Sequence, residues 1–462
     1  MVVSEDKIHE LLSLTKDFDK NEDKILSELS SLPSYVEVAE FLDASSLDAT
    51  VCYRIFMALD LEVASNVFGD LSFDVQKQIY NMSDKITFAK MFTLCPSETR
   101  ADFYRELEYK EKIQLLPFLS KEIRNDVVEL SFYKDDTAGG IMSTDFAILF
   151  KDMTISEALS KLRHDAPSKK MLYIAYVVDK DMKMIGFVEL ANLILADMKA
   201  KIKDFIKYNF ISANVDQDKE TVCALIEKYS LIAIPILNDE NQLIGIVKYD
   251  DAISVIKEEQ NEDFEKFMGI SGEHDDDDYI KISSWKNYKK RIAWVLILFF
   301  LGILTCLALT RYEDFMQKNS FLFLFYPMIS AVGGNIGSQT ASIIVRALSF
   351  KEISIKDSFH VLWKEIKTAV FMAITFFLLA FWEVMIVGYW QSYPSGLWII
   401  SFAIALALAL QIIFAIVLGV ILPILVKSLG QDPAVVASPA ITTLVDISGT
   451  IIYFCIAKRI LL

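Results

Sequence analysis

Five long apolar segments in the C-terminal part of the chain constrain its fold more strongly than any other feature. The segments occupy residues 292–309, 321–345, 369–390, 397–426 and about 434–457. A helix needs about 20 mostly apolar residues to cross the hydrocarbon core of a bilayer, and each segment falls within or above the usual range. The sequence therefore predicts an all-α transmembrane domain of five helices within residues 289–462, embedded in a lipid bilayer.

Basic residues between the predicted spans indicate their orientation. Lysine and arginine are enriched in cytoplasmic loops, and here they follow the second and fourth spans, whereas residues 391–396 after the third span contain none. The basic residues of these loops are Arg346, Lys351, Lys356, Lys364, Lys367 and Lys427. We therefore expect the N-terminal domains in the cytoplasm and the C-terminus outside a multi-pass protein of the cell (inner) membrane.

The formal charge of −16 is distributed unevenly along the 462 residues. From Ser284 onward there are 14 basic and 8 acidic residues, which leaves a charge of −22 on the first 283 residues. Such acidity excludes nucleic acid as a partner, because phosphate binding needs basic residues, but it permits cation binding. The five cysteines are scattered without a CxxC pair, and no apolar signal segment opens the chain, so we expect a reducing compartment.

The first 131 residues are predicted to form a superhelical, all-α N-domain. Short amphipathic segments follow Ser72, Ser83, Ser97 and Ser120. Serine is a favoured residue at helix N-termini, and the regular spacing of these starts predicts weakly repeated short helices.

A β-α-β-β-α pattern then occurs twice. Residues 171–190 and 231–251 both alternate as strand, acidic turn and strand, and a predicted helix precedes and follows each copy. The repetition resembles a tandem CBS (Bateman) module of α/β type, with CBS domain 1 at 132–200 and CBS domain 2 at 201–260. CBS pairs often bind adenosine nucleotides through a Ser or Thr and an Asp after the second strand. The corresponding residues here are Glu189, Asn192, Lys248 and Asp251, of which only Asp251 fits, so ATP binding stays open.

Polar residues inside two of the predicted spans suggest a path for a cation. Asn335 and Gln339 are four residues apart and share one helical face beside Gly334. In the fifth span, Asp446 lies near the centre, where a charge costs about 2.5–3.5 kcal/mol and is a functional candidate by default. The residues that share or border its face are Ser438, Thr442 and Thr443. Close helix packing with buried amides is the alternative interpretation of the second span.

Two other classes of protein remain possible on these residues. Glu383 is a second acid within a predicted span and could serve a CBS-regulated anion or proton-coupled transporter. A membrane-anchored nucleotide sensor without transport would use only the CBS pair. Nothing in the pattern indicates an enzyme.

The sequences GGNIGSQTASIIVRAL, DPAVVASPAITTLVDISGTIIYF and DDTAGGIMST, together with the domain order, resemble the MgtE family of magnesium channels. The resemblance implies a homodimer that transports Mg²⁺ and is gated by intracellular Mg²⁺. It also implies a connecting plug helix within residues 261–288, where the acidic run Asp275–Asp278 lies, and makes Asp446 the pore cation site. The cytosolic sensor acids that it implies are Asp218, Glu220, Asp251, Glu259, Glu262 and Asp263, with Glu98 and Asp102 as candidates in the helical domain.

Overall fold

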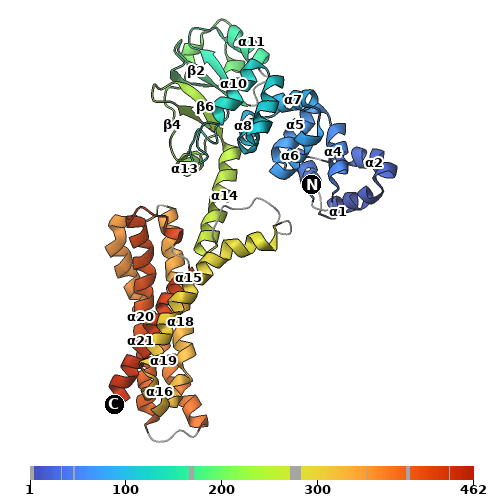
Figure 1. Ribbon diagram of the computed structural model, residues 1–462. Coiled ribbons are helices and arrows are strands. Elements are labelled where there is room, and N and C mark those ends of the chain that lie inside the picture. The colour runs from blue at the N-terminus through green and yellow to red at the C-terminus, as the bar shows by residue number, and fades with distance from the viewer. Residues whose placement is uncertain are drawn as a thin grey trace. The chain divides into compact units, whose positions relative to one another are not determined.

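The computed structural model describes residues 5–461 apart from positions 33, 45–46, 166–170, 271–281, 351, 392–395 and 436–437 (Figure 1). Two compact units are distinguished, Met1–Glu259 and Gln260–Leu462. The acidic run Asp275–Asp278 and much of the predicted connector lie outside the described residues. The three predicted fold classes are confirmed: a helical N-terminal domain, an α/β CBS pair and a helical C-terminal part.

The N-terminal domain is a succession of short helices packed around one apolar core that includes Phe68, Phe88 and Phe103. Its α-helices are α1 (Glu5–Leu14), α2 (Phe18–Ser30), α3 (Tyr35–Leu42), α4 (Ala49–Ala58), α5 (Leu61–Asp70), α6 (Phe73–Met82), α7 (Lys85–Leu94), α8 (Ser97–Glu106), α9 (Tyr109–Leu115) and α10 (Lys121–Leu130). Short 3-10 turns at Thr15–Asp17 and Leu116–Phe118 complete it.

Two of the four predicted serine caps are wrong. Ser120 caps α10 by accepting a hydrogen bond from the Ile123 N–H, and Ser72 occupies the N-cap position of α6. Helix α7 is instead capped by Asp84, whose carboxylate accepts two backbone N–H bonds where a serine oxygen would accept one. Ser97 is already the first residue of α8, because Pro96 holds the N-cap position.

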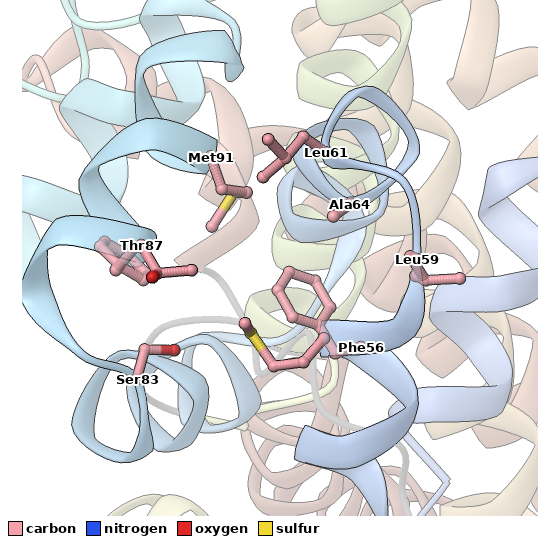
Figure 2. A pocket seen from close by; sticks show the side chains of 9 residues that line it. Phe56, Leu59, Leu61, Ala64, Ser83, Thr87 and Met91 are labelled. Atoms are coloured by element: carbon pink, nitrogen blue, oxygen red, sulfur yellow. The ribbon is translucent and has the colours of Figure 1, made fainter.

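A small apolar pocket lies between helices α4, α5 and α7 of this domain (Figure 2). Phe56, Leu61 and Met91 are among the side chains that line it. Its volume of about 30 Å³ leaves room for about one or two water molecules. The pocket is therefore a packing defect and is too small for a ligand.

The CBS pair consists of two three-stranded sheets with the same strand order, and the predicted helices flank both. The first repeat contains β1 (Phe146–Phe150), α11 (Ile155–Asp165), β2 (Met171–Val178), β3 (Met184–Glu189) and α12 (Leu190–Leu195), and the second β4 (Ala213–Asn214), α13 (Lys219–Tyr229), β5 (Ala233–Leu237), β6 (Leu243–Lys248) and α14 (Tyr249–Phe267). In each sheet the middle strand pairs parallel with the first and antiparallel with the third. Side chains such as Tyr176 and Ile246, from different repeats, join one shared apolar cluster.

The C-terminal unit contains five helices long and apolar enough to cross a membrane within its described residues. The helices of this unit are α15 (Ser284–Thr310), α16 (Glu313–Lys318), α17 (Ser320–Phe323), α18 (Tyr326–Ser349), α19 (Ser358–Trp390), α20 (Leu397–Ser428) and α21 (Ser438–Leu461). Pro327, within the second predicted span, stands in the first turn of α18. Proline fits this position because the first turn needs no intrahelical N–H donor.

Glycines allow helices α18 and α20 to approach each other closely. A Cβ atom added at Gly419 would lie 2.7 Å from the Gly337 carbonyl oxygen, which is shorter than any normal contact. Small residues at such crossings give membrane helices their packing energy, since lipid offers no hydrophobic driving force between them. This contact therefore sets the distance between α18 and α20.

Candidate cation pathway

Four pairs of facing residues connect the antiparallel helices α18 and α21. From one end to the other they are Tyr326 with Thr450, Ser330 with Asp446, Gly334 with Thr442 and Ser338 with Ser438. Successive pairs are four residues apart on each helix, so all lie on one face of both helices. We call this set the polar ladder.

Asp446 is held within the polar ladder by Ser330. The Ser330 hydroxyl donates to Asp446 Oδ1 at 2.6 Å, the length of a charge-assisted hydrogen bond. Asp446 is half-buried, so one carboxylate oxygen is fixed while the group as a whole stays partly accessible. Because the partner of the carboxylate is a hydroxyl and not a basic side chain, its charge is available to attract a cation.

The small residues next to Asp446 determine how closely the two helices approach. A Cβ at Gly334 would lie 2.9 Å from Thr442 Cγ2 and 3.8 Å from Asp446 Oδ1. The hydroxyls of Thr442 and Thr443 donate to carbonyls one turn earlier in α21, at 3.1 and 2.9 Å, and Ser438 contacts Ser338. Gly334, Ser438 and Thr442 therefore belong to the interface between α18 and α21.

Asn335 and Gln339 lie on a different face of α18. Both side chains are exposed on the single chain, whereas Gly333, Ile336 and Gly337 of the same helix are buried. An exposed amide at membrane depth has no water to bond with, so it must meet protein or line an aqueous cavity. This face therefore needs a second surface that the single chain does not supply within its described residues.

Gln411 is a buried polar residue whose role the sequence did not reveal. It lies on α20 with no exposed surface, and its Nε2 donates to the Val445 carbonyl at 2.7 Å. A Cβ at Gly449 would lie 2.7 Å from that nitrogen, so the glycine leaves room for the amide. Because Val445 precedes Asp446, this contact fixes the part of α21 that carries the acid.

Glu383 does not join this arrangement. It lies on α19 and is exposed on the single chain. The buried side chain of Gln411 donates to Val445 and not to Glu383. Asp432, at the turn before α21, accepts a hydrogen bond from the Ala434 N–H at 2.9 Å and contacts Lys266 Nζ at 3.5 Å.

Several predicted sensor acids are bound to lysines. Glu259 contacts Lys219 at 2.9 Å, and Glu262 contacts Lys266 at 2.8 Å. Asp218 caps α13 by accepting the Thr221 N–H at 3.0 Å. Two further predicted sensor acids are Glu220, in the first turn of α13, and Asp263, on α14. In the described part of the chain, no three acidic, histidine or cysteine side chains form a group that could hold a metal ion.

Glu98 and Asp251 meet at Lys248, where the helical domain contacts the second CBS repeat. Lys248 Nζ lies 2.6 Å from Glu98 Oε1 and 3.3 Å from Asp251 Oδ2. Burial would raise the pKa of Glu98, but the charge and hydrogen bond of Lys248 outweigh it and hold that pKa below its ordinary value. Burial raises the pKa of Asp251 to about 7 despite Lys248. Asp102 is more exposed and pairs with Arg105 at 3.1 Å.

Two kinds of contact residue were not predicted from the sequence. Ser330 and Ser338 lie four residues before and after Gly334, so the helical period could have indicated both. Lys248 occupies the position at which a nucleotide-binding CBS repeat has Ser or Thr, yet its partner Glu98 is 150 residues away. No sequence pattern predicts such a pairing.

A five-helix membrane unit with a carboxylate in a polar helix interface, following a CBS pair in the chain, is the arrangement expected of the class of membrane cation transporters. Family models match the same three parts. They are MgtE, described as a divalent cation transporter, at 326–456, the MgtE intracellular N domain at 34–136, and CBS domains at 138–199 and 202–258.

Named relatives cover most of the chain. The magnesium transporter MgtE of Enterococcus faecalis is 32% identical over 73% of this chain and 72% of its own. That of Thermus thermophilus is 30% identical over 75% of both chains. The crystal structure of the cytosolic domain of the Mg²⁺ channel MgtE in complex with ATP is 24% identical, covers 53% of this chain and 99% of its own, and has a TM-score of 0.49. The chain belongs to the MgtE family.

Proposed function

We propose that the chain is a Mg²⁺ channel or transporter for magnesium uptake, with Asp446 as the cation site of its pore. The single observation that carries this proposal is the 2.6 Å contact that holds the half-buried Asp446 in the polar ladder. Relatives named magnesium transporters over about three quarters of the chain support the choice of ion.

The chemistry of the ladder suits a hydrated divalent ion. Mg²⁺ prefers octahedral oxygen ligands and loses water reluctantly, so it often keeps several waters when bound. Hydroxyls and amides near Asp446 can accept hydrogen bonds from those waters, while the carboxylate supplies the charge. A carboxylate about 4.5 Å from a divalent ion contributes about 2 kcal/mol even at the dielectric constant of water, and more in a drier pore.

A homodimer completes the pathway in this proposal. Asn335 and Gln339 are exposed on α18 and need a polar counterpart. A second copy related by a two-fold axis would place the same amides opposite them, since the same patch meets itself in such an interface. It would also bring two Asp446 carboxylates to one path, doubling the attractive charge.

Intracellular Mg²⁺ gates the pore in this proposal by acting on the acidic N-terminal part, which lies in the cytoplasm while the C-terminus lies outside. Glu259 and Glu262 are bound to lysines, so Mg²⁺ would compete with ammonium groups for them. A ligand shifts an equilibrium only as far as its affinities for the two states differ. The acids Asp218, Glu220 and Asp263 belong to the same proposed sensor, and ATP binding at the CBS pair stays open.

Replacement of Asp446 by Asn tests the pore assignment, because Asn keeps the volume and removes the charge. Uptake of Mg²⁺ into proteoliposomes should fall at least about tenfold, while expression and membrane insertion persist, because a neutral amide is easier to place in a bilayer. Asp446→Glu should keep part of the flux and lose selectivity. Full uptake by Asp446→Asn at equal expression would refute the assignment and leave a buried structural acid.

A CBS-regulated anion or proton-coupled transporter makes a different prediction. It would need Glu383, so Glu383→Gln should abolish a pH-dependent flux, while Asp446→Asn should spare it. The exposed position of Glu383, away from the polar ladder, favours the Mg²⁺ proposal.

A further inference from the structure

Lys248 lies beside three carboxyl groups at the junction between the helical domain and the second CBS repeat. Its Nζ is 2.6 Å from Glu98, 3.3 Å from Asp251 and 4.0 Å from Asp250. The side chains of Lys248 and Glu98 are 16% and 15% exposed, whereas those of the ion pair Arg346–Glu352 are 67% and 53% exposed. Exposed pairs contribute little to stability, so Lys248 is distinguished by its burial.

The pairing joins two domains within the same compact unit. Glu98 is on α8, and Lys248 is the last residue of β6. The neighbouring contacts of α8 go to the segment before the first CBS strand: the Ser97 N–H donates to Asp145 at 2.8 Å, and the Ser97 and Ser143 hydroxyls are 2.9 Å apart. Lys248 therefore adds the charged link from α8 to the second repeat.

The carboxyl groups around Lys248 keep its side chain charged, and they outnumber its single positive charge. Burial alone would lower the pKa of Lys248, but Glu98 and Asp251 outweigh burial and raise that pKa above its ordinary value. A single ammonium thus faces three carboxyl groups. Removing one partner of a buried charge pair lowers stability, because the other charge stays buried without compensation.

We propose that Lys248 is a built-in cation that docks the helical domain onto the second CBS repeat without any divalent ion. The ammonium lies among the carboxyl groups of Glu98, Asp250 and Asp251 and, being covalently attached, does not leave when Mg²⁺ is scarce. This inference rests on the proposed gating and limits the residues involved in it. The response of the pore to intracellular Mg²⁺ is assigned to acids further along α14, such as Glu259 and Glu262. The docking of α8 onto the CBS repeat does not depend on Mg²⁺.

Hydrogen exchange of the α8 amides in the full-length protein tests this inference, in EDTA and in millimolar Mg²⁺. In the wild type, α8 (Ser97–Glu106) should exchange equally slowly in both. The Lys248→Met variant keeps the length of the side chain and removes its charge. In EDTA its α8 amides should exchange at least about tenfold faster, because the partial opening that detaches α8 then costs less free energy.

Controls separate undocking from unfolding. Lys257→Met removes an exposed lysine of α14 and should change nothing, and Lys248→Arg should keep α8 protected in EDTA. Slow exchange of the β5 and β6 amides verifies that the CBS repeat stays folded. If Lys248→Met exposes these strands too, Glu98→Gln replaces it as the decisive variant and should release α8 alone.

Two outcomes would overturn the proposal. They are Mg²⁺-dependent protection of α8 in the wild type, and unchanged protection of α8 in Lys248→Met in EDTA. The measurement involves no transport, so its failure leaves the pore assignment of Asp446 untouched.

Discussion

The hydrogen bond from Ser330 to Asp446 gives the most precise prediction about the pore. Ser330→Thr and Ser330→Val add the same volume, but only threonine keeps the hydroxyl. At 2.6 Å the bond is short and its acceptor is a carboxylate, a class worth about 1.5–3 kcal/mol. Each 1.4 kcal/mol is a factor of ten, so complete loss of this positioning would weaken the pore site by at most about 10-fold to 100-fold.

The lower end of this range applies to a half-buried carboxylate, because water can replace part of the lost bond. We therefore expect Ser330→Val to raise the half-saturating Mg²⁺ concentration for uptake by about tenfold relative to Ser330→Thr. The assay is initial uptake into proteoliposomes over a range of Mg²⁺ concentrations, with a dye inside. A purely structural effect would lower the maximum rate through lost protein and leave half-saturation unchanged.

Ser448 provides the matched control for this pair of variants. It is half-buried on α21 close to Asp446, but its hydroxyl donates to the Val445 carbonyl of its own helix at 2.9 Å. Ser448→Val and Ser448→Thr should therefore have equal half-saturation. The reasoning fails if Ser330→Val and Ser330→Thr are indistinguishable, because the hydroxyl would then have no part in placing the carboxylate.

The other predictions concern the acidic N-terminal part. Changing Glu259, Glu262 and Asp263 to their amides should weaken inhibition of uptake by internal Mg²⁺, and inhibition equal to wild type in the same liposome assay would contradict their role as sensors. Asp251 has a pKa of about 7 in the folded chain and about 3.9 when unfolded, so the folded state binds the extra proton between these values. Stability should consequently fall as pH rises from 4 to 7, and Asp251→Asn should flatten this slope in melting temperatures; an unchanged slope would assign it to other groups.

The sequence by itself determined the features that are written in short-range patterns. Apolar length predicted all five membrane helices, and a pattern of strands and helices that occurs twice predicted the CBS pair. The placement of Asp446 within an apolar segment marks it as a functional candidate, because a charge at the centre of a bilayer is costly. Each of these signals depends on neighbours within about 20 residues.

Local signals failed where neighbouring residues competed for one position. Asp84 replaced the adjacent Ser83 as the cap of α7, because a carboxylate accepts two N–H groups. Pro327 lies inside a long apolar segment of the sequence, yet it stands in the first turn of α18. These differences concern element boundaries, which depend on single hydrogen bonds.

Only the tertiary structure decided which distant residues meet. The Ser330–Asp446 bond depends on the relative register of α18 and α21, and a shift of one residue would turn the serine away. That register follows from glycine contacts between helices, such as Gly334 against Thr442, which no single helix encodes. The Glu98–Lys248 pair likewise joins residues 150 positions apart, and the packing of the helical domain against the second CBS repeat brings them together.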